Sequence, residues 1–187
     1  MNYVRGFAPW LCYAALSPVD WRLGTGAAAL AALYLLALQL RARTVDLLTA
    51  VTCGFFVVMA AVALADPGTG LRHWICALAN GTLAVTALAS LAVRRPFTLV
   101  FARAEVPREF WDSPRFLRVN MVLTAIWASG FALGALACAV VVGYDHSATV
   151  PLVSAQVLAF VLPFAVGGRY AARAKARAAT AAGQALA

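Results

Sequence analysis

The sequence is poor in charged residues, and above all in acidic ones. Charged residues make up 12% of the chain against 64% hydrophobic residues, and only 7 residues are Asp or Glu. A soluble domain has about a quarter charged residues, and a soluble fold with the present composition would expose large apolar patches to water. In a bilayer the same side chains face lipid. The composition therefore predicts one membrane domain over residues 1–187, without room for a separate soluble catalytic domain.

The sequence also lacks a recognisable cysteine motif. Its four cysteines are Cys12, Cys53, Cys76 and Cys138. All four lie in apolar runs, without a Cys-x-x-Cys pair or a Cys/His spacing typical of metal ligands. Cysteine packs as a small hydrophobic side chain in such surroundings. We therefore interpret the cysteines as packing residues and expect no pair suited to thiol redox chemistry, no metal and no other cofactor.

The sequence has only 2 histidines, and neither indicates a metal site. His73 and His146 are both expected at the outer membrane face, beside Asp66 and Asp145. We interpret them as interfacial anchors, and a shared metal or haem site is the alternative.

Apolar runs long enough to cross a bilayer account for most of the chain. A spanning helix needs about 20 mostly apolar residues, because the hydrocarbon core is about 30 Å thick. Five runs qualify: residues 24–40, 45–65, 74–93, 119–143 and 149–167. A sixth run, residues 7–17, is bracketed by Pro9 and Pro18 and is a short span, a re-entrant segment or an interfacial helix. The prediction is an all-α bundle of five full transmembrane helices plus this short N-terminal helix.

The basic residues predict the orientation of these helices. Twelve of the 15 Lys and Arg residues fall on one side: Arg41, Arg43, Arg94, Arg95, Arg103, Arg108, Arg115, Arg118, Arg169, Arg173, Lys175 and Arg177. The other side has Arg22 and Arg72, and Arg5 joins the larger set only if residues 7–17 span the membrane. Because cytoplasmic loops carry the excess of basic residues, we expect a cytoplasmic loop 94–118 and a cytoplasmic basic tail 168–187. Five spans with an outside N-terminus are the alternative.

The basic clusters also indicate what the protein contacts. They lie next to apolar runs, as expected for a protein held against the anionic lipids of an inner leaflet. Aromatic residues are not interleaved with them in a groove-like pattern, so we do not expect nucleic-acid binding.

The predicted spans contain almost no ionisable side chain, with Asp46 at the very start of one of them. Charges inside a membrane are costly and mark proton relays, ion paths or catalytic groups, so their absence disfavours a proton-coupled pump. The milder polar residues that remain include Asn80, Thr86, Asn120 and Gln156. We interpret these as interhelical hydrogen-bonding groups, with the lining of a solute path as the alternative.

One motif indicates close helix packing. Gly130 and Gly134 form a GxxxG motif, which allows a neighbouring helix to approach closely. That neighbour belongs either to the same fold or to a second copy in a homodimer.

The loop 94–118 is the main candidate for binding. Its aromatic residues alternate with arginines, which is typical of a segment at the headgroup boundary, and arginines there can hold lipid phosphates. The residues expected to bind a partner or a headgroup are Arg94, Arg95, Arg103, Glu105, Arg108, Glu109, Trp111, Arg115 and Arg118. A site built around Glu105 and Glu109 is the enzymatic alternative. No nucleophile or metal motif accompanies these carboxylates, so no catalytic residue is assigned.

Several motifs occur in an order that is known from one protein family. A short apolar stretch with a proline, FAPWLCYAAL, precedes the Ala-rich run GTGAAALAAL. Arg94–Arg95–Pro96 closes the third full span, and Glu105–Val106–Pro107 follows. Phe116 then lies four residues before Asn120, on the way to a helix with Trp127. Over most of its length the chain resembles the intracellular septation protein A family, also called the inner-membrane protein YciB.

The chain also departs from this family. The family usually has tryptophan where Phe116 falls, its helix tryptophan follows the asparagine sooner than Trp127 does, and the insertion around residues 112–115 is not typical.

The resemblance implies a bacterial inner-membrane protein of cell-envelope maintenance and septation, with no defined catalytic activity. Such a protein acts as a scaffold through contacts with cell-division or cell-wall synthesis proteins, here through the loop 94–118 together with the basic tail. A small-solute or lipid transporter is the first alternative, and an enzyme acting on a lipid phosphate is the second.

Overall fold

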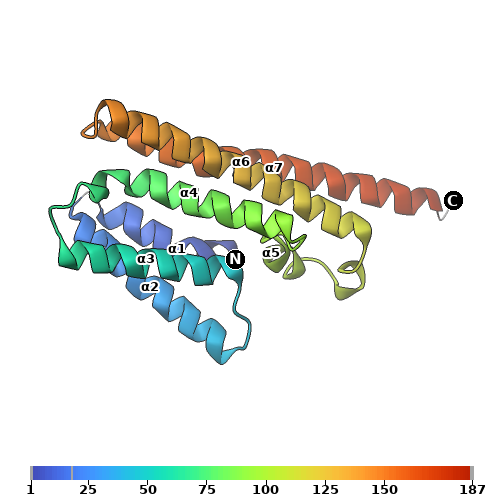
Figure 1. Ribbon diagram of the computed structural model, residues 1–187. Helices are drawn as coiled ribbons and strands as arrows, with labels where there is room; N and C mark the ends of the chain where they lie inside the picture. The colour runs from blue at the N-terminus through green and yellow to red at the C-terminus, as the bar shows by residue number, and fades with distance from the viewer. Residues whose placement is uncertain (1, 18, 186–187) are drawn as a thin grey trace. The chain divides into compact units, whose positions relative to one another are not determined.

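All the regular secondary structure of the described residues is helical (Figure 1). The computed structural model describes the backbone of residues 2–17 and 19–185 and the side chains of residues 6–17 and 19–177. The elements are α1 (Asn2–Leu16), α2 (Trp21–Arg41), α3 (Leu47–Ala65), α4 (Leu71–Ala92), α5 (Leu99–Arg103), the 3-10 helix η1 (Arg108–Phe110), α6 (Pro114–Tyr144) and α7 (Thr149–Ala185). Five of them, α2, α3, α4, α6 and α7, are long and apolar enough to cross a membrane. The predicted all-α membrane fold with a short N-terminal helix is confirmed.

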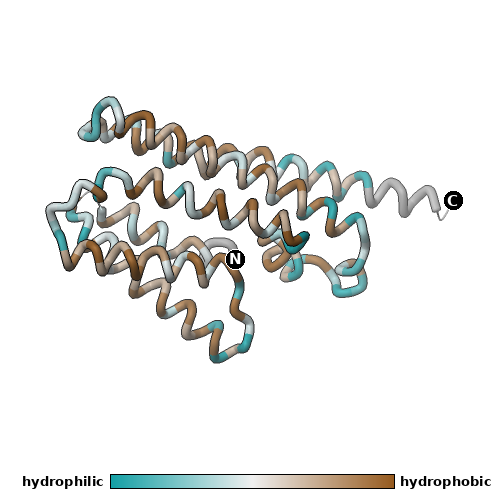
Figure 2. The backbone as a smooth tube through the Cα atoms, viewed as in Figure 1, coloured by the Kyte–Doolittle hydropathy of each residue, from teal (hydrophilic) through white to brown (hydrophobic). Residues whose placement is uncertain are grey.

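The surface of the long helices is apolar as well. Leu64 is 82% exposed and Phe164 is 72% exposed, and many other large apolar side chains are also uncovered. Hydrophilic residues gather in the turns and in the segment between α5 and α6 (Figure 2). Because exposed apolar side chains on this scale are stable in lipid and not in water, the chain is a multi-pass membrane protein.

Capping residues set several helix starts. The side chain of Asp46 accepts a hydrogen bond from the Thr49 backbone N–H at 2.9 Å, and that of Ser113 accepts one from Phe116 N–H at 3.2 Å. Such acceptors satisfy amides that have no partner within the helix. Because Ser113 is followed by Pro114, whose fixed φ suits the first helical position, α6 begins before the predicted residue 119. Arg115 and Arg118 are therefore helical residues, not loop residues.

The chain divides into two compact units, Met1–Ile75 and Cys76–Ala187. In the first unit, α1, α2 and α3 pack against one another. The ring of Trp10 in α1 stacks on Phe55 of α3 at a centroid distance of 5.5 Å and lies 4.7 Å from the ring of the fully buried Phe56. Residues 7–16 thus belong to a helix that is packed against this unit.

In the second unit, α6 and α7 run antiparallel and pack closely along their lengths (Figure 1). A Cβ atom added to Gly134 would lie 2.5 Å from the Cβ atom of Ala159, and one added to Gly130 would overlap the ring of Pro163. The two glycines of the GxxxG motif therefore face α7 of the same chain.

The interpretation of all four cysteines as packing residues is wrong for two of them. Cys76 in α4 and Cys138 in α6 form a disulfide, with Cα atoms 5.9 Å apart. The two residues are 62 positions apart, so no local motif indicates the pair. Cys76 lies just after the start of α4 and Cys138 just before the end of α6. Residues 93–113 connect the two helices, and α6 then runs back along the unit, so both cysteines lie at the same end. Cys12 and Cys53 are free thiols.

Candidate functional site

An arginine-lined groove lies between the start of α6 and the later part of α7. Its volume is about 540 Å³, and its walls are formed by Pro114, Arg115, Arg118, Val119, Tyr170, Arg173, Ala174 and Arg177. Residues three or four apart share one face of a helix, which places Arg115 with Arg118 and Arg173 with Arg177. The antiparallel packing of α6 and α7 brings these two faces together. We call this surface the arginine groove.

The charge of the arginine groove is unbalanced. No carboxylate is among its lining residues, and none of its four arginines has an ion pair within the part of the chain that is described. Arg115 is fixed in place, because its Nη2 group donates a hydrogen bond to the carbonyl oxygen of Ala174 at 3.1 Å. Four guanidinium groups around one cavity repel one another, and a bound anion relieves this repulsion. The groove is therefore suited to a group with several anionic oxygens, which arginine binds in a bidentate manner.

A second basic group lies in the loop before α6. The Cζ atoms of Arg103 and Arg108 lie 5.2 Å and 5.6 Å from the ring centroid of Trp111, which are cation–π distances. The indole N–H of Trp111 donates to the carbonyl oxygen of Val106 at 2.9 Å. These contacts hold the ring in one orientation. We call Arg103, Arg108 and Trp111 the tryptophan clamp.

The nine residues predicted to bind a partner or a headgroup do not form one site. Two of them line the arginine groove and three form the tryptophan clamp. The other four, Arg94, Arg95, Glu105 and Glu109, are exposed in the segments around α5 and belong to neither group.

Four residues of the groove lie in α7, and the sequence did not single out any of them as a binding residue. Tyr170, Arg173, Ala174 and Arg177 belong to the basic tail, which the sequence includes in the contact surface only as a whole. The spacing of Arg173 and Arg177 is a usable signal, because it predicts a basic stripe on one helix face. Which helix this stripe faces follows only from the packing of α6 on α7.

A polar cluster surrounds the disulfide near the other end of α6. The Nδ2 group of Asn80 donates to Gln156 Oε1 at 2.7 Å and to the carbonyl oxygen of Cys76 at 3.0 Å. Gln156 Oε1 also lies 3.2 Å from Cys76 Sγ. Asn80 is fully buried, and its Oδ1 atom has no hydrogen-bond partner among the described residues. This cluster joins α4, α6 and α7.

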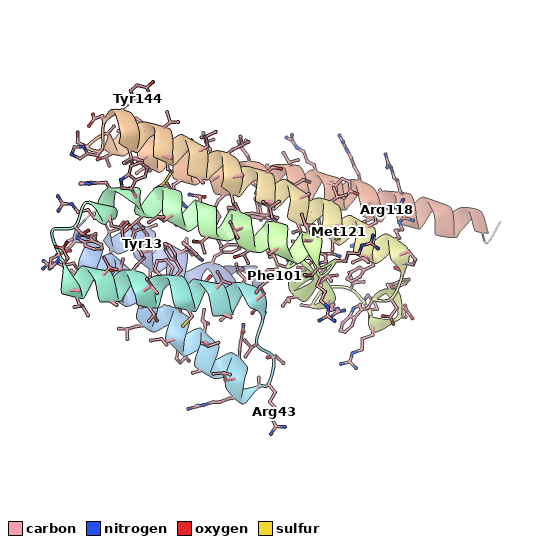
Figure 3. All side chains as sticks on the ribbon, viewed as in Figure 1. Tyr13, Arg43, Phe101, Arg118, Met121 and Tyr144 are labelled. Atoms are coloured by element: carbon pink, nitrogen blue, oxygen red, sulfur yellow. A yellow bond between two sulfur atoms is a disulfide. The ribbon has the colours of Figure 1, made fainter. Side chains whose placement is uncertain are left out.

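The two sites are separated along α6. Figure 3 labels Arg118 near the start of α6 and Tyr144 at its end. Arg118 lines the groove, and Cys138 lies less than two turns before Tyr144.

The other predicted intramembrane polar residues bond within their own helices. The hydroxyl of Thr86 donates to the carbonyl oxygen of Thr82 at 2.7 Å. Asn120 Nδ2 donates to the carbonyl oxygen of Phe116 at 2.9 Å. Asn80 and Gln156 thus contact each other, whereas Thr86 and Asn120 each satisfy a carbonyl of their own helix. Asn120 Oδ1, like Asn80 Oδ1, has no partner in the described part of the chain.

Neither site contains a metal-binding constellation. Among the described residues, no group of three or more His, Cys, Asp or Glu side chains could hold a metal ion. Compared with protein-family models, curated proteins and solved structures, the chain matches none. The arginine groove, the tryptophan clamp and the polar cluster are therefore the features that indicate the function.

Proposed function

We propose that this chain is a non-catalytic scaffold of the bacterial inner membrane that binds the headgroup of an anionic phospholipid in its arginine groove. The observation that carries the proposal is the groove itself. It has four arginines and no carboxylate, and it lies where the apolar parts of α6 and α7 give way to basic sequence.

The chemistry of the groove favours a phosphate headgroup over other anions. Arginine presents a planar fork of N–H donors that matches the geometry of phosphate oxygens. Tyr170 supplies an amphipathic ring of the kind enriched at membrane interfaces, and Val119 supplies an apolar wall next to the acyl chains. A volume of about 540 Å³ is within the usual range for small-ligand sites.

The basic residues support a cytoplasmic position for the groove. The excess of Lys and Arg around the start of α6 and in the tail is typical of the cytoplasmic side, so we place the C-terminus there. Anionic lipids of that leaflet attract clusters of basic residues. A bound headgroup would neutralise the groove and fix the start of α6 against α7.

In this proposal the lipid anchors the basic end of the protein, and the tryptophan clamp is presented to other proteins. The resemblance to the septation protein A family supports cell-division or cell-wall synthesis proteins as those partners, and a role in cell-envelope maintenance. Crosslinking in the native membrane, followed by mass spectrometry, tests this part. Recovery of such proteins, lost when the arginines of the loop are reversed in charge, is the expected result. Recovery of the chain alone would contradict it.

Lipid binding is tested with two variants of equal charge. Arg118→Gln/Arg173→Gln removes two arginines from the groove, and Arg41→Gln/Arg43→Gln removes two arginines at the end of α2. Native mass spectrometry of the detergent-purified protein measures the binding of phosphatidylglycerol and phosphatidylcholine. We expect the groove variant to lose at least about a hundredfold in affinity for phosphatidylglycerol, because two charge-assisted bonds of about 1.5 kcal/mol or more each are lost. The α2 variant should bind like the wild type, and an equal loss in both variants would contradict a site in the groove.

The transporter and enzyme alternatives give different results. A transporter would move a labelled lipid or solute across a liposome membrane, and an enzyme would release product from a lipid phosphate. Transport that is lost in Arg118→Gln/Arg173→Gln would overturn the scaffold role, and turnover that is lost in this variant would overturn the non-catalytic role; either result would leave the binding site in place.

A further inference from the structure

The disulfide between Cys76 and Cys138 lies close to one membrane face. Cys76 is about 7.5 Å along the helix from the start of α4, and Cys138 is about 9 Å from the end of α6, at 1.5 Å per residue. Both cysteines therefore lie within two helical turns of the end of a helix that is long and apolar enough to cross the membrane, and we expect a small amphiphilic molecule at the membrane surface to reach them.

The two cysteine residues differ in exposure. Cys76 is partly exposed, whereas Cys138 is 0% exposed. An incoming thiolate attacks the sulfur atom that it can reach, and the other sulfur atom leaves. The exposure therefore assigns Cys76 as the sulfur that is attacked and Cys138 as the leaving group.

The polar atoms around the disulfide suit the reduced form better than the oxidised one. A disulfide has no S–H group to donate, yet Gln156 Oε1 lies 3.2 Å from Cys76 Sγ. A second acceptor, Asn80 Oδ1, is buried without a partner among the described residues. Its side chain is beside the disulfide, with Nδ2 4.0 Å from Cys76 Sγ. Buried polar atoms nearly always have a partner, so an acceptor left over next to a disulfide requires an explanation.

The position of Asn80 Oδ1 provides that explanation. This atom lies 3.0 Å from the place that a Cβ atom on Gly134 would occupy. Gly134 is one helical turn before Cys138, on the same face of α6. When the cysteine pair is reduced, the Cys76 thiol can donate to Gln156 Oε1, and Asn80 Oδ1 is the acceptor available on the side of Cys138. Reduction thus supplies a donor for Asn80 Oδ1 and a second donor for Gln156 Oε1, which already accepts from Asn80 Nδ2.

We propose that Cys76 and Cys138 form a redox-active pair that exchanges with a small dithiol, and that Asn80 and Gln156 stabilise its reduced form. One thiolate of the dithiol attacks Cys76 Sγ. The bond to Cys138 breaks, and its electron pair stays on Cys138 Sγ, which takes up a proton. The mixed disulfide joins Cys76 to one sulfur atom of the dithiol. The second thiolate of the same dithiol then attacks that sulfur atom and releases Cys76, which also takes up a proton. The dithiol loses two electrons and two protons, and the cysteine pair gains them.

A redox titration tests this proposal. The protein, with Cys12 and Cys53 replaced by Ser and Ala, is placed in lipid nanodiscs and equilibrated with defined ratios of reduced to oxidised dithiothreitol. A maleimide mass tag then reports the reduced fraction. We expect reversible reduction of the folded protein. Asn80→Leu should require a roughly tenfold higher ratio, which corresponds to about 30 mV for a two-electron couple. The matched control is Thr86→Val, which removes a buried polar group elsewhere on α4 and should not change the ratio.

Two results would overturn the proposal. One is a disulfide that is reduced only after the protein is denatured, which would make it purely structural. The other is an equal midpoint for the wild type and Asn80→Leu, which would remove the role of the amides.

A second measurement decides the matter if Asn80→Leu does not fold. Single-cysteine proteins are prepared by Cys138→Ser and by Cys76→Ser, and each is treated with a small aromatic disulfide. We expect Cys76 to react at least about tenfold faster than Cys138, because only Cys76 is accessible. Equal or reversed rates would contradict the assignment of Cys76 as the attacked sulfur.

Discussion

Trp10 in α1 donates its indole N–H to the hydroxyl oxygen of Thr52 in α3 across 3.3 Å, and both side chains are buried. A buried indole N–H needs an acceptor, and in a membrane no water is available to provide one. Thr52 provides it from the second turn of a long apolar helix. The bond thus explains how α1, whose apolar part covers only Gly6–Leu16, is held against the first unit.

The bond between Trp10 and Thr52 is tested by Trp10→Phe, which keeps an aromatic ring and removes the donor. We expect the free energy of unfolding to fall by about 1 kcal/mol, in the range of interhelical hydrogen bonds in membrane proteins. Unfolding in mixed micelles of increasing SDS content measures it. A double-mutant cycle with Thr52→Val is the control. If Trp10→Phe costs as much in the Thr52→Val background, the hydrogen bond contributes nothing and the loss comes from packing alone.

Close packing between α6 and α7 predicts opposite effects for two alanine substitutions. In Gly134→Ala the new methyl group would meet the Cβ atom of Ala159 at 2.5 Å, so the helices must move apart. We expect a loss of about 1–3 kcal/mol, as for other overpacked sites. Gly143→Ala, in the same helix, has no atom within 4 Å and should be neutral or slightly stabilising. Equal unfolding midpoints for the two variants would contradict the packing described.

The sequence predicted the long helices well because a membrane span needs little beyond length and apolar composition. The predicted run 45–65 became α3, which starts at Leu47 because Asp46 caps it. The run 119–143 was extended at its start to Pro114, because a serine cap and a proline at the first position favour helix there. These differences at the helix ends are local, and the capping residues Asp46 and Ser113 account for them.

The sites were harder to predict, because they depend on which helices are neighbours. The disulfide joins residues 62 positions apart, and Arg115 meets the carbonyl oxygen of Ala174 from 59 positions away. Apolar periodicity does not determine such pairs, since a lipid-facing and a protein-facing surface are both apolar in a membrane helix. The same reason explains why Asn80 and Gln156 were both identified as polar residues of the spans, but not as partners.

The turn after α6 predicts a dependence of stability on pH. Asp145 Oδ1 accepts two hydrogen bonds from Ser147, one from the hydroxyl at 2.6 Å and one from the backbone N–H at 2.9 Å. These bonds hold the pKa of the Asp145 carboxyl below its ordinary value. Because the pKa of Asp145 is lower in the folded than in the unfolded chain, its ionised carboxyl stabilises the folded state at every pH above the unfolded pKa, which is about 4. This stabilisation is lost as the pH falls through the pKa of Asp145 in the folded state. Ser147→Ala should therefore be less stable than the wild type at neutral pH, by an amount that shrinks below about pH 4. Unfolding midpoints measured across this range test it, and a constant difference would contradict the proposed cause.

The tryptophan clamp predicts that Trp111 protects the loop before α6. Its ring lies against the guanidinium groups of Arg103 and Arg108, and its N–H bonds to the carbonyl oxygen of Val106. In Trp111→Leu these contacts are lost, so the loop should open more often, and trypsin should cleave after both arginines several times faster. Mass spectrometry of the fragments from inside-out vesicles measures the rates. Phe110→Leu is the matched control, because Phe110 is an exposed neighbour. If both variants are cleaved alike, the ring does not hold the loop, and cleavage only in right-side-out vesicles would reverse the proposed orientation.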